Sequence, residues 1–465
     1  MICFEDILYP FLKLFNKLPS FFRNLIGTLY AILPLKVRYG SFYLKYRERI
    51  ILFQKTDEEG KKLLVNKLLS DQVNNAINSV TFYKHFSKFW ILDDLIEFPI
   101  ISKKIITNRG NDFVNLSQIR KKIISNTGGS SGTPFTFFIE KGITRPKEAA
   151  HFHWFWGNYG YKYGDKVLEL RGKPLQDNSD FEFQAIGNRL VVSCYNLNQN
   201  SIREIHKQIH KFNPKFIHAY PSSLLTFTKE LQLYLKSDKA DINIQAIFLG
   251  SENLFDEDEQ YFKGFFETKI VTWYGHSECL IHGAKCEISG DYHFYPFYGF
   301  IELVDEKDQR IEKPGIEGRI IATGFDNRVM PLIRYDTGDI GVLSPRKECS
   351  CGFKGVSLSK ILGRGKDYIV LKDNTSVSLT ALIFGQHHEE FAMIKEMQII
   401  QNEPGIITVH IVPLKEISGE DIESFKNRLI NSVKTNSLVV QIQVVEKIEK
   451  TIRGKHKLLI QNIEK

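Results

Sequence analysis

The stretch Ser125-Asn126-Thr127-Gly128-Gly129-Ser130-Ser131-Gly132-Thr133-Pro134 decides how this chain is interpreted. Its three glycines permit unusual backbone angles, so such a loop can bring N–H groups close to phosphate oxygens. The apolar runs Lys122-Ile123-Ile124 and Phe135-Thr136-Phe137-Phe138-Ile139 flank it, and both are typical of strands. The sequence therefore predicts a strand, a loop and a second strand. Taken alone, the stretch also fits a surface linker of small residues.

Two well-known loop types match this stretch only in part. Gly128 to Gly132 fit the G-x-S-x-G pattern of serine hydrolases, in which Ser130 would be the nucleophile and a helix would follow it. Pro134 and the strand-like run after it argue against that helix. A P-loop is excluded, because no Gly-Lys-Ser/Thr closes the stretch. A serine hydrolase that uses Ser130 is kept as an alternative, and a helix after Gly132 would support it.

Composition places the chain among globular proteins with more than one domain. It has 465 residues, of which 43% are hydrophobic and 25% charged, and a length of this kind predicts two or three domains. The net charge of +8 is spread along the chain without a compact basic block, so no nucleic-acid partner is expected. The six cysteines are sparse for this length, which favours a reducing, cytoplasmic location.

The N-terminal segment, residues 1–40, is apolar but interrupted by charged residues. Its longest uncharged run, Asn24 to Leu35, is too short to span a bilayer, and no signal peptide is expected. Two interpretations are open: helices packed on the main domain, or an amphipathic segment that makes a peripheral contact with a membrane. Packing is favoured, because apolar helix stripes usually face a core.

The pattern of apolar and polar residues divides the chain into three parts. Residues 1–100 look mainly helical, and residues 101–365 have the alternating strands and helices of an α/β domain. A boundary is expected at Gly363-Arg364-Gly365-Lys366-Asp367, and residues 366–465 form a small α+β domain. The predicted helices are 58–78, 146–160, 201–211 and 418–434, and the predicted strands are 166–170, 189–193, 215–219, 246–249, 269–273, 317–323, 340–344, 368–371, 397–401, 406–413 and 439–445.

Five further segments complete a pattern with the opening loop. In chain order they are Gly250-Ser251-Glu252, Tyr274-Gly275-His276-Ser277-Glu278, Arg334-Tyr335-Asp336-Thr337-Gly338-Asp339, Gly363-Arg364 and Thr451-Ile452-Arg453-Gly454-Lys455. In order and approximate spacing the six segments resemble the core motifs of the adenylate-forming enzymes, the acyl-CoA synthetase superfamily. The closest resemblance is to the phenylacetate–CoA ligase-like branch, which includes relatives associated with capsular polysaccharide biosynthesis.

The resemblance implies a fold and a two-step reaction. The fold is α/β, with a large N-terminal domain of layered sheets and helices and a small, mobile C-terminal α+β domain. In the first step a small carboxylic acid attacks the α-phosphorus of ATP and releases pyrophosphate. The resulting acyl-adenylate then passes its acyl group to a thiol or an amine. A non-catalytic, nucleotide-binding member of the fold is a further alternative, but intact Glu278 and Lys455 argue against it.

The same resemblance assigns a role to each motif. Glu278 helps to hold Mg²⁺, Asp339 accepts hydrogen bonds from the ribose hydroxyls, and Lys455 neutralises charge as the adenylate forms. Lys366 is the hinge residue about which the small domain rotates. The remaining nucleotide-binding residues are Thr127, Gly128, Gly129, Ser130, Ser131, Gly132 and Thr133 at the β- and γ-phosphates, Gly250, Ser251, Glu252, Tyr274, Gly275 and Ser277 around the adenine, and Arg364 at the ribose or phosphate.

The chain departs from the family pattern after the hinge. Many members carry a glycine-containing loop there that leads into the coenzyme A tunnel, whereas residues 370–378 of this chain contain no glycine. Coenzyme A is therefore one of several candidate acceptors, beside a carrier-protein thiol, an amine and a sugar amine.

Cysteine and histidine positions suggest a metal site. Cys349-Ser350-Cys351 is a tight C-x-C turn, and Cys286 and His293 follow Glu278. Three thiolates and one imidazole suit tetrahedral Zn²⁺, and relatives with a similar turn support a structural zinc ion here. His282 is an alternative ligand, and idle buried thiols are the alternative to any metal.

Overall fold

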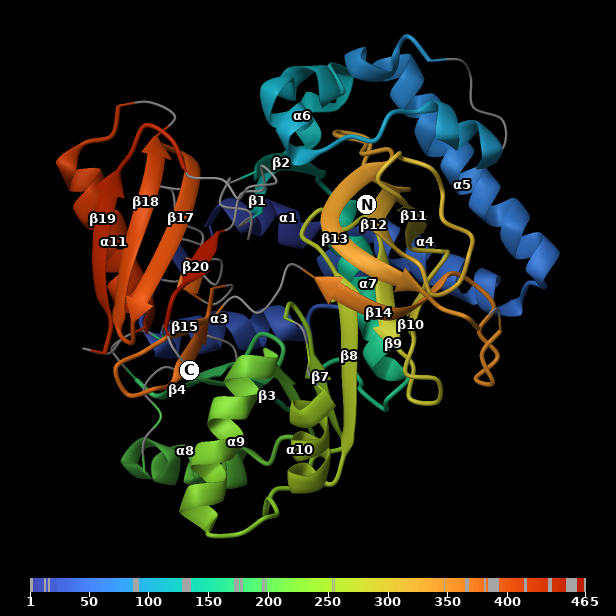
Figure 1. Cartoon of the computed structure of the whole chain (residues 1–465). Coiled ribbons are helices and arrows are strands. Elements are labelled where there is room, and N and C mark those ends of the chain that lie inside the picture. Colours follow the sequence, from blue (N-terminus) through green and yellow to red (C-terminus); the bar gives the residue numbers. More distant parts are fainter. Residues whose placement is uncertain are drawn as a thin grey trace. The chain divides into compact units, whose positions relative to one another are not determined.

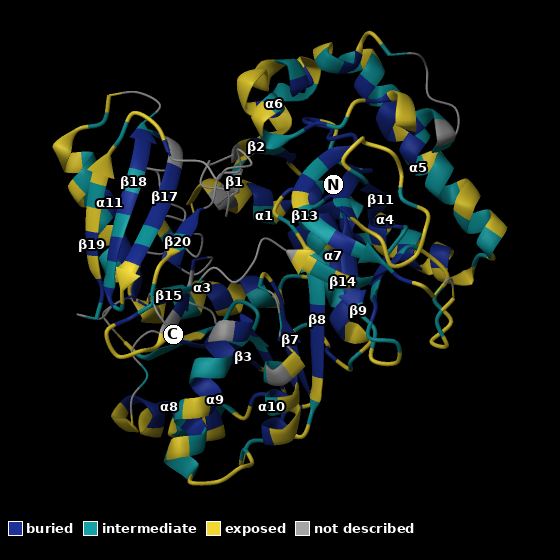
Figure 2. Ribbon diagram, in the orientation of Figure 1, coloured by how far each residue is buried: buried dark blue, intermediate teal, exposed yellow. Residues whose placement is uncertain are grey.

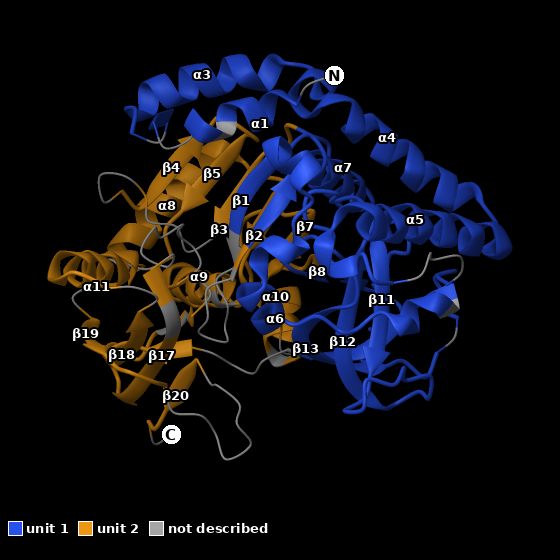
Figure 3. Ribbon diagram, turned by 90° about the horizontal axis from the view of Figure 1, so that it is seen from above, with its two compact units in different colours: residues 1–125, 137–163, 272–364 blue, residues 126–136, 164–271, 365–465 orange. Residues whose placement is uncertain are grey.

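The computed structural model of the chain contains two compact units (Figures 1 and 3). Unit 1 comprises residues 1–125, 137–163 and 272–364, and unit 2 comprises residues 126–136, 164–271 and 365–465. The boundary predicted at residue 365 coincides with one of these divisions, whereas the predicted large domain, residues 101–365, is shared between the units. The residues that the structure describes are 3–11, 14–15, 17–86, 92–127, 135–170, 175, 179–194, 197, 199–252, 254, 256–346, 348–363, 368–379, 382–383, 393–413, 416–433, 437–448 and 458–463.

Helices make up most of the N-terminal part of unit 1, as predicted. The side chain of Asp57 accepts a hydrogen bond from the N–H of Gly60, which caps the helix that begins at Glu58. Tyrosines of α4, including Tyr43 and Tyr46, pack with Ala150 of α7 in one buried cluster. The helices and 3-10 turns of this unit are α1 (Phe4–Leu8), η1 (Tyr9–Phe11), α3 (Ser20–Ile32), α4 (Leu35–Lys55), α5 (Glu58–Ser79), η2 (Thr81–Tyr83), η3 (Leu92–Glu97), α6 (Lys103–Asn108), η4 (Gly110–Phe113), η5 (Leu116–Lys121) and α7 (Thr144–Gly157).

Helix α3 differs from the packing expected for the N-terminal segment. Gly27 and Tyr30 on one side of the helix are buried. The opposite side exposes six large apolar side chains, so this stripe is not part of the core; they are Phe21, Phe22, Leu25, Ile26, Leu29 and Ile32. Among the described residues, no helix is long and apolar enough to cross a membrane.

An antiparallel sheet forms the framework of unit 1. Its strands follow the order β11-β12-β13-β14-β10-β9-β8. Residue registers pair Tyr274 with Gly283 between β8 and β9, and His293 with Ser357 between β10 and β14. The sheet thereby links the segments that carry the predicted site residues of this unit. The strands are β8 (Lys269–Gly275), β9 (His282–Lys285), β10 (Tyr292–Phe294), β11 (Gly299–Val304), β12 (Glu317–Gly324), β13 (Tyr335–Leu343) and β14 (Ser357–Gly363).

The middle of unit 2 is a mostly parallel sheet. Strands β7, β6, β3 and β5 are parallel neighbours, and β4 joins β5 antiparallel at the edge. Leu168 and Leu170 of β3 share a core with the isoleucines of α8. Their spacing of two residues places both side chains on the same face of the strand. The elements are β3 (Val167–Leu170), β4 (Phe181–Gln184), β5 (Arg189–Val192), α8 (Gln199–Phe212), β6 (Phe216–Ala219), α9 (Pro221–Leu235), β7 (Ala246–Leu249) and α10 (Asp256–Phe266).

The C-terminal part of unit 2 has its own sheet and core. Its strands follow the order β19-β18-β17-β20, and Phe425 and Leu429 of α11 pack into the core with β17 and β18, which Figure 2 colours as largely buried. Gly405 joins β17 to β18 with a φ of 78°, and a Cβ there would lie 2.8 Å from the carbonyl oxygen of Ser437. The elements are β15 (Tyr368–Val370), β16 (Ser376–Ser378), β17 (Ile394–Glu403), β18 (Ile406–Pro413), α11 (Gly419–Val433), β19 (Val439–Val444) and β20 (Leu459–Gln461).

The opening loop is flanked by strands, as predicted. Strand β1 (Lys122–Thr127) precedes it and β2 (Phe135–Glu140) follows it, and the two strands pair. Because the segment after the loop is a strand, the helix that a G-x-S-x-G nucleophile requires is missing at that place. The serine hydrolase alternative with Ser130 is therefore wrong.

Candidate functional site

The phosphate loop and three other predicted residues cannot be placed. Residues 128–134, Arg364, Lys366 and Lys455 lie outside the described residues. Thr127 is the last residue of β1. The described part of the candidate site is therefore built from the strands that follow in the chain.

Tyr274 and Asp339 come together in unit 1. Tyr274 lies near the end of β8, and its hydroxyl donates a hydrogen bond of 2.8 Å to Oδ2 of Asp339 on β13. The backbone just before Asp339 is fixed locally, since Gly338 has a φ of 79° and the N–H of Asp339 bonds Oγ1 of Thr337. The register of β12 against β13 shifts beside this segment, which is a common way to redirect a side chain. The pair presents a partly exposed carboxylate that can accept hydrogen bonds from a diol.

Glu278 is a buried, ionised carboxylate. The hydroxyl of Tyr335 donates to its Oε1 at 2.5 Å, Nδ1 of His276 lies 3.2 Å from Oε2, and Nζ of Lys103 lies 4.0 Å from Oε1. Burial raises the pKa of Glu278, but the hydrogen bond from His276, the charges of Lys103 and His276 and the hydrogen bond from Tyr335 together lower it to about 2. Oε1 thus faces Tyr335 and Lys103 while Oε2 faces His276, and these three groups fix the orientation of the carboxylate.

Other residues of the predicted adenine segments occupy the ends of strands. Gly275 is the last residue of β8, and Ser277 is exposed in the turn that follows. In unit 2, Gly250, Ser251 and Glu252 follow β7, and Ser251 adopts a φ of 69°. A non-glycine residue in this left-handed region marks a sharp change of chain direction directly after a buried parallel strand, which is where ligands commonly bind in α/β sheets.

The four predicted metal ligands converge in unit 1. The ligand atoms of Cys286, His293, Cys349 and Cys351 all lie within 4.8 Å of one another. The sulfurs of Cys286 and Cys349 are 3.8 Å apart, and Sγ of Cys351 is 3.8 Å from Nδ1 of His293. Sulfurs that bind one tetrahedral Zn²⁺ at about 2.3 Å are separated by roughly 3.8 Å, so the observed spacing suits the ion.

Neighbouring groups hold these ligands in place. The N–H of Cys286 bonds the carbonyl of Asp291, the N–H of Cys349 bonds the carbonyl of Phe353, and the Phe353 ring stacks on His293 at 4.3 Å. Ser289 Oγ lies 3.5 Å from Nε2 of His293, the ring nitrogen that faces away from Cys351. A hydrogen bond from the backbone of Cys351 is the main cause that lowers the pKa of Cys349 to about 7, whereas burial raises that of Cys351 to about 11.

His282, the alternative ligand, does not join this cluster. It lies on β9 with its ring centroid 4.3 Å from that of His151, among aromatic side chains. Burial lowers the pKa of His282 to about 3. Both histidines are therefore neutral core residues. The buried side chains of the aromatic segment 151–156, such as His151 and Phe155, also belong to the core.

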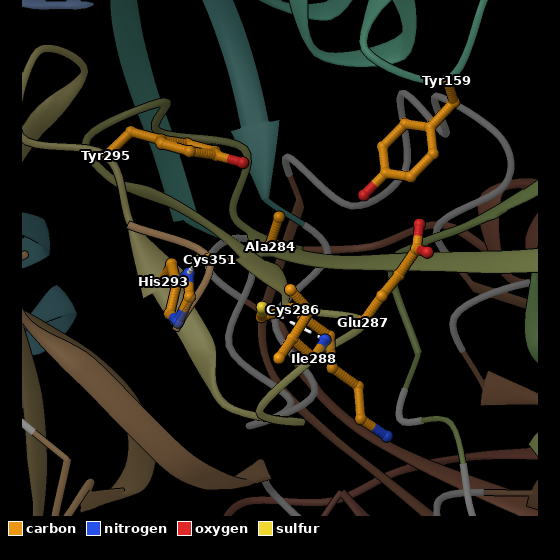
Figure 4. Close-up of a pocket in the computed structure, with 9 residues that line it drawn as sticks. Tyr159, Ala284, Cys286, Glu287, Ile288, His293, Tyr295 and Cys351 are labelled. Atoms are coloured by element: carbon orange, nitrogen blue, oxygen red, sulfur yellow. Dashed lines mark hydrogen bonds between the residues drawn. The ribbon is translucent and has the colours of Figure 1, made fainter. Parts of the chain in front are cut away.

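A cavity of about 260 Å³ adjoins the cysteine cluster (Figure 4). Tyr159 and Glu287 lie across it from His293 and Cys351. The cavity shares three of the four candidate ligands, which gives the cluster access to solvent. It is lined by Tyr159, Ala284, Lys285, Cys286, Glu287, Ile288, His293, Tyr295 and Cys351.

Sequence and structure comparisons relate the chain to acid-activating ligases. Residues 372–462 match the family described as the CapK C-terminal domain. Over 97% of its length the chain is 23% identical to Protein CapK of Staphylococcus aureus, of which the match covers 99%. Over 35% of its length it is 26% identical to the phenylacetate–coenzyme A ligase of Thermus thermophilus, of which the match covers 37%.

Solved structures show the same fold. A 2-hydroxyisobutyryl-CoA ligase, in complex with 2-HIB-AMP and CoA in its thioesterification state, aligns with a TM-score of 0.55 at 16% identity. The alignment covers 88% of this chain and 91% of that one. The same ligase in its postadenylation state gives a TM-score of 0.52.

The chain is thus similar over nearly its whole length to Protein CapK and has the fold of the acyl-CoA ligase structures. Most of the described motif residues lie at the ends of strands or directly after them, whereas Asp339 lies inside β13. Three contacts of Glu278 were not predicted. Tyr335 and His276 stand inside quoted motifs without a role, and Lys103 lies in a helix that carries no motif, so only Tyr335 and His276 offered a signal in the sequence.

Proposed function

We propose that the protein is an AMP-forming ligase that activates a carboxylic acid with ATP. The observation that carries this proposal is the arrangement in unit 1, where the Tyr274–Asp339 hydrogen bond joins two strands of one sheet and the ionised Glu278 follows one of these strands. Similarity to phenylacetate–coenzyme A ligases supports this reaction class. Catalysis of such a step is mainly positioning and stabilisation of charge.

Each predicted site residue has its own role in the formation of the acyl-adenylate. Asp339, oriented by Tyr274, binds the ribose hydroxyls, and the loop around residues 127–133 holds the β- and γ-phosphates. Glu278 would offer a carboxylate oxygen to Mg²⁺, an ion that takes one or two carboxylates together with substrate phosphates and would neutralise charge on them. Lys455 stabilises the developing charge, and Arg364 binds the ribose or phosphate.

Coenzyme A is the acceptor that we propose for the second step. The 2-hydroxyisobutyryl-CoA ligase, whose structure holds CoA, supports this choice. The segment after the hinge is the β15–β16 hairpin, whose turn contains Asn374 with a φ of 61° in place of a glycine. A carrier thiol or an amine is the alternative acceptor. Similarity to Protein CapK supports a place in surface polysaccharide biosynthesis.

Pyrophosphate release tests the first step. The full-length protein, ATP and Mg²⁺ are incubated with a panel of carboxylic acids, and Lys455→Ala serves as the control for contaminating activity. Acid-dependent pyrophosphate from the wild type alone is expected. No acid-dependent release across a broad panel would overturn the proposal. Addition of coenzyme A or amines to the active samples then identifies the acceptor.

Zinc is the ion that we propose for the cysteine cluster. Its ligands would be Cys286, His293, Cys349 and Cys351, and its role structural. It would join the turn between β9 and β10 to the loop between β13 and β14. All four positions of a tetrahedral ion are then filled by protein, which is typical of structural sites.

We also propose that α3 rests on an anionic lipid surface. Its six exposed apolar residues form the stripe of an interfacial helix. The sequence around it favours negative lipids, because residues 7–47 contain no acidic residue but seven basic ones, of which Arg38 is buried and the others are Lys13, Lys17, Arg23, Lys36, Lys45 and Arg47.

Vesicle binding checks the lipid contact. We expect Leu25→Glu/Leu29→Glu to reduce sedimentation with phosphatidylglycerol-containing vesicles at least about tenfold, since burial of one leucine stabilises by roughly 1.5–3 kcal/mol. The matched control is Leu63→Glu/Leu233→Glu, which adds the same charge at two other exposed leucines. Equal binding by both variants, or loss of a concentration-dependent dimer in place of vesicle binding, would contradict the proposal.

A further inference from the structure

A second group of metal-ligating side chains lies in unit 2, in a region that none of the adenylation motifs occupies. His206 and His210 stand one turn apart on α8, and Asp241 lies between α9 and β7. Their ligand atoms lie within 4.8 Å of one another. Nε2 of His206 is 2.9 Å from both oxygens of Asp241 and from Nε2 of His210, which in turn is 3.2 Å from Oδ2 of Asp241.

The fold brings these three groups together through ordinary packing. Ile202, Ile205 and Ile209 bury one side of α8 against the sheet core. A spacing of four residues then places His206 and His210 on one face beside that buried stripe. The ring of His206 also contacts Tyr234 of α9, with centroids 5.2 Å apart, so its orientation is fixed from two sides.

Hydrogen bonds alone do not explain the three short distances among His206, His210 and Asp241. A neutral imidazole nitrogen either donates or accepts a hydrogen bond. If both Nε2 atoms carry a proton, two N–H groups face each other across 2.9 Å. If only one does, the lone pair of the other faces an oxygen of Asp241 at 2.9 or 3.2 Å. A divalent cation between the three groups satisfies every lone pair at once.

The distances also suit one particular coordination geometry. Two ligands at right angles on a metal, each bound at 2.0–2.1 Å, lie about 3.0 Å apart. The observed separations of 2.9 to 3.2 Å fit three adjacent corners of an octahedron. This is the two-histidine, one-carboxylate facial arrangement, which leaves the opposite positions to water or to another ligand.

We propose that His206, His210 and Asp241 form a binding site for a divalent transition-metal ion on unit 2. Imidazole ligands select ions such as Ni²⁺, Co²⁺ and Zn²⁺, and Mg²⁺ binds elsewhere because it prefers oxygen ligands. The site is solvent-accessible, as His210 and Asp241 have 46% and 45% of their side-chain surface exposed. Bound metal ties α8 to the loop before β7 and keeps an open face for exchangeable ligands.

Metal titration of the full-length protein tests this site. Protein whose cysteine cluster has first been saturated with zinc is titrated with Ni²⁺ by calorimetry. We expect one further ion per chain, and loss of that binding in His206→Ala, in His210→Ala and in Asp241→Asn. His410→Ala, which removes a histidine bonded to Gln443 in the C-terminal sheet, is the matched control and keeps the binding.

Cobalt spectra separate the two clusters. Co²⁺ bound to thiolates gives intense charge-transfer absorption, whereas Co²⁺ on two imidazoles and a carboxylate gives only weak visible bands. The weak bands are expected to vanish in Asp241→Asn while the thiolate absorption stays. Absence of a second ion, its retention in all three variants, or binding that survives Asp241→Asn unchanged would each overturn the three-ligand assignment. Because the measurement is of binding, its outcome is independent of acid activation.

Discussion

Glu278→Gln is expected to lower acid-dependent pyrophosphate release by about 10²–10³-fold, the usual effect of removing one group that stabilises transition-state charge. The pKa of Glu278 is about 2, so the wild-type side chain is ionised in any ordinary assay. Glutamine has nearly the same shape and still accepts a hydrogen bond from Tyr335. The substitution therefore removes the negative charge that holds Mg²⁺ while it preserves much of the local packing.

The half-saturating Mg²⁺ concentration separates this role from a purely structural one. If Glu278 holds the ion, Glu278→Gln raises that concentration as well as lowering the rate. Glu317→Gln, at an exposed position of β12, is the control for loss of a carboxylate on the same sheet. The assignment of Glu278 to Mg²⁺ would be contradicted by the following result. Glu278→Gln unfolds at the wild-type temperature, releases pyrophosphate at more than half the wild-type rate and needs no extra Mg²⁺.

Sequence motifs explain why part of the proposed site could be predicted. Tyr274 near the end of β8 and Asp339 inside β13 both lie in motifs that resemble those of adenylate-forming enzymes, so both were assigned from these motifs. The hydrogen bond between Tyr274 and Asp339 could not be predicted, because it depends on how the strands between β8 and β13 are ordered in the sheet. Lys103 illustrates the same limit, since its approach to Glu278 joins segments whose proximity no local pattern specifies.

Helix α3 shows a different limit of sequence reasoning. Its apolar stripe has the period of a helix face, and such faces usually pack on a core. Periodicity predicts that a face is apolar without specifying what covers it. In unit 1 the small and aromatic side, Gly27 and Tyr30, is buried, and the stripe with Leu25 and Leu29 is exposed.

The four residues of the cysteine cluster could be predicted because the chain has only six cysteines. Cys286 and His293 were linked to the C-x-C turn by residue type, by order in the chain and by resemblance to relatives with a similar turn. The sequence did not show which strands pair. Strand β10 pairs with both β9 and β14, and this pairing brings the segment with Cys286 close to the loop with the C-x-C turn. The exclusion of His282 likewise follows from burial on β9, which no spacing rule specifies.

Cys351→Ser is expected to abolish zinc binding and to lower the free energy of unfolding of the protein by about 4–5 kcal/mol, the range associated with loss of a metal site. Zinc content measured by mass spectrometry should fall from one ion per chain at this cluster toward none. Ser350→Ala, an exposed position in the same turn, should keep both the zinc and the wild-type thermal unfolding temperature.

Chelation provides the independent check of the same cluster. A strong chelator should lower the unfolding temperature of the wild type by more than that of Cys351→Ser, because only the wild type has an ion to lose from this cluster. The effect should reach the proposed nucleotide site, since β9 pairs with β8, which carries Tyr274, and β14 pairs with β13, which carries Asp339. We therefore expect zinc-free protein to require more ATP for half-maximal pyrophosphate release. Full zinc content in Cys351→Ser, or a chelator effect of equal size on both proteins, would show that the cluster is not a zinc site.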